Sequence, residues 1–185
     1  MIFLTHFYRR TLKFDLINKF LYKNTKELPK LKKIILNFGC NNNEIKNLAA
    51  SLLALELIAN QKGILTLSKK SNISLKIRKG NPVGCKVTLQ KTNMFDFITK
   101  TLIDVYPKLK NFHGFNFNSR KLRKKTFSYE IEDTFSFPEL ETNYSLFNNY
   151  LPKLSITFVV SSKSKEELLF ILKSLQIPLK LSKQI

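Results

Sequence analysis

Between residues 73 and 90 apolar and polar side chains alternate with a two-residue period, and the alternation is interrupted once, at residues 80–84. Gly80 and Gly84 there tolerate a positive φ, and Pro82 fixes its own φ, so the interruption is typical of a turn. Strict alternation indicates strands with one buried face, so this stretch predicts two half-buried strands joined by a turn. The apolar positions are Ile73, Leu75, Ile77, Cys85, Val87 and Leu89.

The opposite face of these predicted strands is polar and carries no acid. Single exposed lysines often only keep a sheet edge soluble. Solubility is served equally by mixed charge, however, and eight lysines and arginines but no acidic residue lie between Glu56 and Asp96. The pattern therefore predicts a face that binds a polyanion. Its members are Ser74, Lys76, Arg78, Lys86, Thr88 and Gln90.

The charge of the whole chain supports the same interpretation. Its 185 residues include 32 basic and 13 acidic side chains, which give a formal net charge of +19. AT-rich codons would favour lysine, but they would not remove aspartate and glutamate. The excess therefore indicates nucleic acid as the first candidate partner and an anionic membrane surface as the second. The length suits one domain, 1–185, with an N-terminal basic helix in 1–27 and an α+β core in 28–180.

Four segments have helical periodicity. Residues 7–23 predict a basic amphipathic helix with Phe7, Leu12, Leu16, Phe20 and Leu21 on its apolar side. Residues 44–60 predict a helix with Asn43 as its N-cap, and Met94–Tyr106 predicts a third. Ser164 and Glu167 have the spacing of a capping box, which predicts a last helix from there to about residue 176. The apolar stripe of the 44–60 helix is Ile45, Leu48, Leu52, Leu55 and Ala59.

Further strands are predicted at 30–38, 64–67, 127–131 and 154–158, and residues 111–125 are expected to form a loop. Helices and strands mix without a regular βαβ repeat. This order favours an α+β fold with a mainly antiparallel sheet and helices packed on one face.

The residue types that metal binding or catalysis would require are scattered along the sequence. Cys40 and Cys85 stand alone with His6 and His113 as the only possible co-ligands, which argues against a zinc site or a disulfide framework. No phosphate loop, zinc-protease motif or nucleophile elbow occurs, so we expect no catalytic residue, no metal and no cofactor, and the chain is not predicted to be an enzyme. The one acidic cluster, residues 130–141, is expected apart from the basic sheet.

Several segments occur in the order found in a known family. The run Ile-Arg-Lys-Gly-Asn-Pro-Val-Gly-Cys-Lys-Val-Thr-Leu at 77–89 is the most specific of them, and the rest repeat the family's spacing. Together they resemble the large-subunit ribosomal protein that binds 5S rRNA, the fifth in the bacterial series, over nearly the whole chain. The segments are 28–39, 76–89, 94–97, 107–115 and 137–139.

The resemblance implies an α+β protein of the central protuberance that binds 5S rRNA on its sheet during translation. Asn37, Gln61 and Thr88 match family positions that contact 5S rRNA, and Lys76, Arg78 and Lys86 would attract its phosphates. The family also implies contacts with large-subunit rRNA, neighbouring large-subunit proteins and, through an intersubunit bridge, a protein of the small-subunit head. The loop expected to face P-site tRNA is formed by Ser68, Lys69, Lys70, Ser71 and Asn72.

The location follows from composition and from the start of the chain. The sequence begins where family members begin, so we expect no transit peptide and an organellar gene. A mitochondrial ribosome is the expected location. The alternatives are a plastid and the cytoplasm of a bacterium with an AT-rich genome. Two other functions stay open on the residues alone: a peripheral membrane protein that uses the 7–23 helix, and an RNA-processing enzyme. A ribosomal protein is preferred, with no membrane partner, because only this function explains the ordered segments.

Overall fold

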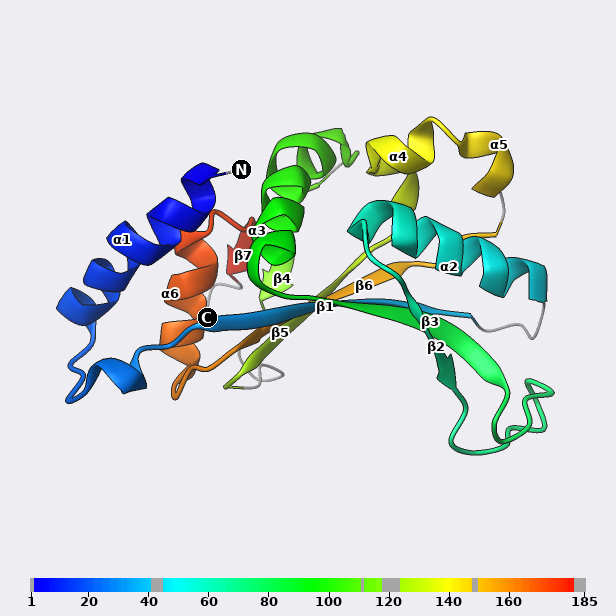
Figure 1. Cartoon of the computed structure of the whole chain (residues 1–185), viewed down its shortest axis with the longest axis horizontal. Helices are drawn as coiled ribbons and strands as arrows, with labels where there is room; N and C mark the ends of the chain where they lie inside the picture. The colour runs from blue at the N-terminus through cyan, green and yellow to red at the C-terminus, as the bar shows by residue number, and fades with distance from the viewer. Residues whose placement is uncertain (1, 41–44, 111, 118–123, 148–149, 182–185) are drawn as a thin grey trace. The chain divides into compact units, whose positions relative to one another are not determined.

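The computed structural model describes residues 2–40, 45–110, 112–117, 124–147 and 150–181 (Figure 1). Its main feature is a five-stranded sheet with the strand order β2-β3-β1-β6-β5. A second sheet pairs β4 with β7 in parallel. The strands are β1 (Leu31–Gly39), β2 (Ile64–Leu67), β3 (Pro82–Leu89), β4 (Phe115–Phe117), β5 (Thr126–Ile131), β6 (Leu154–Val160) and β7 (Leu179–Leu181).

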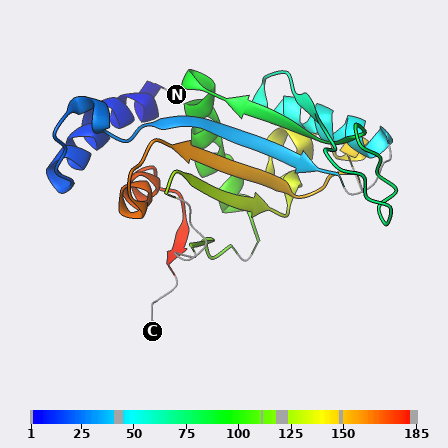
Figure 2. The ribbon, with the colours of Figure 1, turned by 90° about the horizontal axis from the view of Figure 1, so that it is seen from below.

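The five-stranded sheet is antiparallel, as the sequence predicts for the α+β class. Ile64 of β2 lies opposite Lys86 of β3, and the N–H of Cys40, just after β1, donates to the carbonyl of Val83 on β3 at 2.9 Å. The arrows of β3, β1, β6 and β5 point in alternating directions in Figure 2. The predicted fold class is therefore confirmed.

Helices and strands follow one another along the chain without a regular alternation, since β3 comes directly after β2 and α5 (Tyr144–Phe147) directly after α4 (Pro138–Glu141). Several of the helices are single turns of three to five residues, and one of these is π-helical. The α-helices are α1 (Ile2–Lys19), α2 (Ile45–Ala59), α3 (Lys91–Lys100), α4 (Pro138–Glu141), α5 (Tyr144–Phe147) and α6 (Lys165–Ser174). The short turns are η1 (Thr25–Glu27), η2 (Thr101–Val105, the π-helical one), η3 (Tyr106–Lys108) and η4 (Thr134–Ser136).

The chain divides into two compact units, each built from separate segments of the sequence. Unit 1 comprises residues 1–34, 90–128 and 157–185, and unit 2 comprises residues 35–89 and 129–156. Strands β1, β5 and β6 contribute residues to both units.

In unit 1, α1 packs against α3 and α6. Leu12 and Leu16, one helical turn apart, are both 1% exposed and form the buried stripe of α1. The capping box of α6 is present as predicted: the Glu167 N–H donates to Ser164 Oγ at 3.2 Å, and the Glu167 carboxylate accepts from the Ser164 N–H in return. Each hydrogen bond satisfies a backbone or side-chain group that the helix start would otherwise leave unpaired.

In unit 2, α2 packs against β3 and against α4 and α5. The inward-facing side chains of α2 include Ala54 and Ile58, and Ser51 is buried with its hydroxyl donating to the Asn47 carbonyl. The predicted stripe is correct at Leu55 and Ala59, which are buried, but not at Ile45, which is 82% exposed. Cys40 and Cys85 are buried free thiols, as expected for small core residues.

Several predicted boundaries are wrong. The first helix covers 2–19 rather than 7–23, and Leu21, placed on its apolar side, lies beyond its end and is fully exposed. The helix predicted at 94–106 begins at Lys91 and changes to the π-helical turn η2 after Lys100. The expected loop 111–125 contains β4, while positions 111 and 118–123, like the predicted cap Asn43, lie outside the described residues.

Candidate nucleic-acid interface

The polar face of β1 and β3 in unit 2 is the predicted polyanion-binding face. Along β3, buried Cys85, Val87 and Leu89 alternate with exposed Lys86 and half-buried Thr88. The helix α2 lies behind these strands in Figure 2, and the polar face is turned toward the viewer. Strands β1, β2 and β3 contain no carboxylate, so the potential above this part of the sheet is set by lysine and by polar uncharged groups.

Asn37 and Lys86 lie opposite one another on that face. Cys40 pairs with Val83, and the Cα of Gly39 lies 3.5 Å from the point that a Cβ of Gly84 would occupy. Because the strands are antiparallel, the residue three positions before Cys40 on β1 pairs with the residue three positions after Val83 on β3, which places Asn37 across from Lys86. An amide that can donate and accept is thus set beside a cation, which suits a phosphate and the ribose or base next to it.

Gln61 and Thr88 are brought together at the other end of this face. Gln61 is exposed in the turn that follows α2, and its Nε2 donates to the Thr88 carbonyl at 3.4 Å. The turn is held by a second hydrogen bond, from the Gly63 N–H to Glu56 Oε1 at 2.8 Å. The position of Gln61 is therefore fixed from both α2 and β3.

The close approach of β1 and β3 beside this face requires glycine. A Cβ at Gly84 would collide with the backbone oxygen of Phe38 and would lie 3.1 Å from the hydroxyl of Thr66. Gly84 is therefore inside a strand, where it allows two backbones to approach, and is not part of the turn that the sequence predicts.

Lys76 and Arg78 do not share this face, which corrects the prediction. Residues 73–76 form a turn, and Lys76 has a φ of +52° that no strand residue adopts. The strand predicted at 73–79 is absent, and β3 pairs with β2 instead. Both side chains are exposed in the connection between β2 and β3.

This connection, residues 68–81, is an ordered extension of the hairpin rather than an unstructured loop. The N–H of Ser68 donates to the Asn81 carbonyl at 2.8 Å, and Asn72 and Ile77 exchange two hydrogen bonds of 2.8 and 2.9 Å. Its tip is therefore 73–76, beyond the predicted tRNA-facing residues. Those residues, Ser68, Lys69, Lys70, Ser71 and Asn72, form one arm of the extension, with both lysines exposed.

The hairpin exposes several apolar side chains, which the sequence pattern does not predict. Ile73 at the tip is 94% exposed, and on the edge strand β2 Ile64 is 63% and Leu67 is 60% exposed. The two-residue period at 73–77 is real, but in a turn it does not imply burial.

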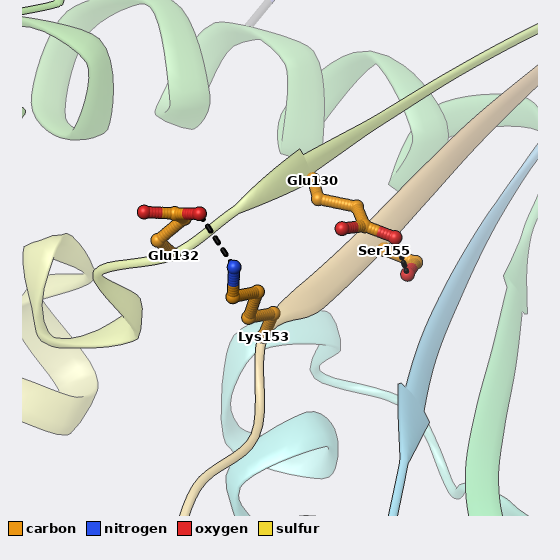
Figure 3. Close-up of polar contacts among 4 residues, drawn as sticks. All are labelled: Glu130, Glu132, Lys153 and Ser155. Atoms are coloured by element: carbon orange, nitrogen blue, oxygen red, sulfur yellow. Dashed lines mark hydrogen bonds and ion pairs between the residues drawn. The ribbon is translucent and has the colours of Figure 1, made fainter.

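The acidic segment is closer to the polar face than expected. Glu130 lies on β5 of the same sheet and accepts from the hydroxyl of Ser155 on β6 at 3.4 Å (Figure 3). Just beyond β5, Glu132 forms an exposed ion pair with Lys153 at 2.5 Å, which holds the pKa of the Glu132 carboxyl below its usual range. The sheet is thus basic toward β3 and acidic toward β5.

The residues that the structure describes contain no group of three or more histidines, cysteines, aspartates or glutamates that could hold a metal ion. Within the same residues, no helix is long and apolar enough to cross a membrane.

Comparison with known proteins identifies the family. Residues 82–179 match the family model for the C-terminus of the ribosomal L5 family. The chain is 40% identical over 174 residues to the large ribosomal subunit protein uL5m of Reclinomonas americana, an alignment that covers 93% of this chain and 94% of the relative. The chain belongs to the ribosomal L5 family.

Two further relatives of this L5-family protein carry the name large ribosomal subunit protein uL5. That of Karelsulcia muelleri (strain GWSS) is 35% identical over 189 residues, covering 97% of this chain and 96% of the relative. That of Malacoplasma penetrans (strain HF-2) is 34% identical over 175 residues, covering 92% of this chain and 90% of the relative. The protein is accordingly a structural constituent of the large ribosomal subunit, with ribosomal RNA and neighbouring ribosomal proteins as partners, and it is not an enzyme.

Proposed function

We propose that this L5-family protein binds 5S rRNA through the polar face formed by β1, β3 and the turn after α2. The observation that carries the proposal is the register that sets Asn37 of β1 beside Lys86 of β3, with Thr88 on β3 and Gln61 held against it from the turn after α2. Lysine supplies attraction to phosphate, while the amides and the hydroxyl supply the directional hydrogen bonds that distinguish one RNA from another.

The hairpin extension carries the second part of the proposal. Its exposed cations, Lys69, Lys70, Lys76 and Arg78, would contact the backbone of P-site tRNA. Because the extension is held by its own backbone hydrogen bonds, it keeps its direction without a partner. We also propose that another surface of the protein bridges to a protein of the small-subunit head.

The location we propose is the mitochondrial ribosome. The relative from Reclinomonas americana supports it through the name uL5m, and the abundance of Lys, Asn, Ile and Phe, which AT-rich codons encode, agrees. The similarity to the relatives from Karelsulcia muelleri and Malacoplasma penetrans keeps a bacterial ribosome as the alternative. Immunogold labelling of the source cells separates the two locations.

Binding of 5S rRNA is tested with Asn37→Ala and Thr88→Val. Each removes directional hydrogen bonds without changing charge, so each should weaken binding to 5S rRNA by about 1–3 kcal/mol and binding to a random RNA of equal length by much less. Filter binding over a salt series provides the measurement, and circular dichroism melts show whether the variants are folded. Equal losses on the two RNAs would show that these side chains do not read 5S rRNA.

Lys69→Ala/Lys70→Ala serves as the matched control and tests the tRNA contact. It removes two exposed cations, so it should leave 5S rRNA binding nearly unchanged and reduce P-site tRNA retention on assembled ribosomes, more at low salt than at high. A variant that does not enter the large subunit would identify the extension as an assembly contact instead.

A further inference from the structure

Unit 1 contains a cavity that the proposed function does not use. It has a volume of about 650 Å³ and lies between α1, the segment that leads into β1, and the start of α3. Six cations from these three segments line it, and none of the described lining residues is a carboxylate. The cations are Arg9, Lys13, Lys26, Lys30, Lys32 and Lys91.

The inner wall of the cavity is apolar and held in place. Leu12 and Met94 are almost completely buried, and the ring of Tyr8 packs on that of Phe95 with 5.2 Å between the centroids. The Tyr8 hydroxyl accepts from the Leu31 N–H at 2.6 Å. The ring is thus fixed at both ends, so the wall is preformed rather than created by a ligand.

Lys91 shows that the charge of this site is not arranged for stability. It occupies the first position of α3, where the helix dipole favours acidic residues, and it has a φ of +52°, which strains a residue with a side chain. A cation in a strained conformation at a helix N-terminus is unfavourable in two respects. Such local conflicts are expected where a residue serves a ligand.

We propose that this cavity receives one unpaired nucleotide of large-subunit ribosomal RNA. The cations at the rim would neutralise its phosphate and the adjoining ones, and the base would lie against the apolar wall beside Tyr8 and Phe95. The volume is in the range of pockets that enclose small ligands, and unstacked bases held against aromatic side chains are a common mode of RNA recognition. The proposal rests on membership of a ribosomal family and does not depend on 5S rRNA binding in unit 2.

The experiment compares two short RNAs on the full chain. One is tetrauridylate, and the other is the same tetranucleotide without its bases, so the two have identical phosphates. Stacking of one base predicts a preference of roughly tenfold for tetrauridylate. In Phe95→Leu, which keeps the wall apolar but removes a ring, this preference should fall. In Lys13→Ala/Lys32→Ala both RNAs should bind more weakly, and the slope of log affinity against log salt should flatten by roughly 1.4, at about 0.7 per phosphate contact.

The matched control is Lys23→Ala/Lys173→Ala, which removes two exposed cations of unit 1 outside the cavity. It should leave the salt slope for tetrauridylate nearly unchanged. The proposal is overturned if the wild-type chain binds the two RNAs equally, if the full preference survives in Phe95→Leu, or if Lys13→Ala/Lys32→Ala and the control flatten the salt slope equally. It is also overturned if those two lysines are needed for anionic vesicles and not for tetrauridylate.

Failure of this proposal can be told apart from failure of the proposed function. Asn37→Ala should leave the preference for tetrauridylate unchanged, because Asn37 is in unit 2 and does not line the cavity. Loss of the preference in Asn37→Ala would move the base-binding site away from the cavity and contradict the inference.

Discussion

Substitution of Gly84 by alanine tests whether the close approach of β1 and β3 determines stability. The added Cβ would collide with the carbonyl oxygen of Phe38, which belongs to the backbone and cannot move aside as a flexible side chain would. One strand must shift, and overpacking of this kind costs about 1–3 kcal/mol. For a chain of this length each kcal/mol lowers the melting temperature by about 2–4 °C, so a decrease of about 2–12 °C is expected.

Gly39→Ala provides the matched control. Gly39 is the residue across from Gly84, yet a Cβ there would have no atom within 4 Å, and its φ is not positive. The change should therefore alter the free energy of unfolding by less than about 0.5 kcal/mol. Thermal melts and urea unfolding of both variants, followed by circular dichroism, give the comparison. If Gly84→Ala melts with the wild type, or if the two variants are equally destabilised, the packing argument is wrong.

Two further predictions concern α6 and the buried thiols. Ser164→Ala removes the capping hydrogen bond to the Glu167 N–H and should cost about 1 kcal/mol in urea unfolding, whereas Ser164→Thr, which keeps a hydroxyl, should lose much less; equal losses would show that the cap contributes nothing. Burial raises the pKa of the Cys85 thiol from its ordinary value of 9.0 to about 12, so the unfolded chain loses this proton first and stability should fall as pH rises from 9 toward 12. Urea unfolding at pH 8 and pH 10 should show a larger loss in the wild type than in Cys85→Ala, and identical losses would contradict this account.

Strands and helix starts with complete local signals could be predicted from the sequence. Phe127, Tyr129 and Ile131 alternate with polar residues and are all buried in β5. A two-residue period over a whole strand is compatible with few structures other than a strand with one buried face. Ser164 and Glu167 likewise identified the start of α6. In the candidate interface, the alternation of β3 placed Lys86 and Thr88 on the polar face, whereas Gln61 came only from the family resemblance.

The predictions that were wrong also have physical explanations. Ile73, Leu75 and Ile77 alternate as a strand would, but only Ile77 is buried, and the positive φ of Lys76 cannot be read from a sequence. Helices α4 and α5 have four residues each, too few to show a helical period. The three-residue strands β4 and β7 pair across more than sixty residues of chain, and no local pattern indicates such a partner.

The interleaving of the two units has a consequence for synthesis of the protein. Unit 1 takes its first segment from residues 1–34 and its last from residues 157–185. A nascent chain therefore cannot complete unit 1 until β6 and α6 have left the ribosome that makes it. Leu12 and Leu16 of α1 can be fully buried only after α6 has been synthesised. A copy that stops short of residue 157 would keep the contacts of α1 with α3 but lack those with α6, so it would expose more apolar surface and be more prone to aggregate.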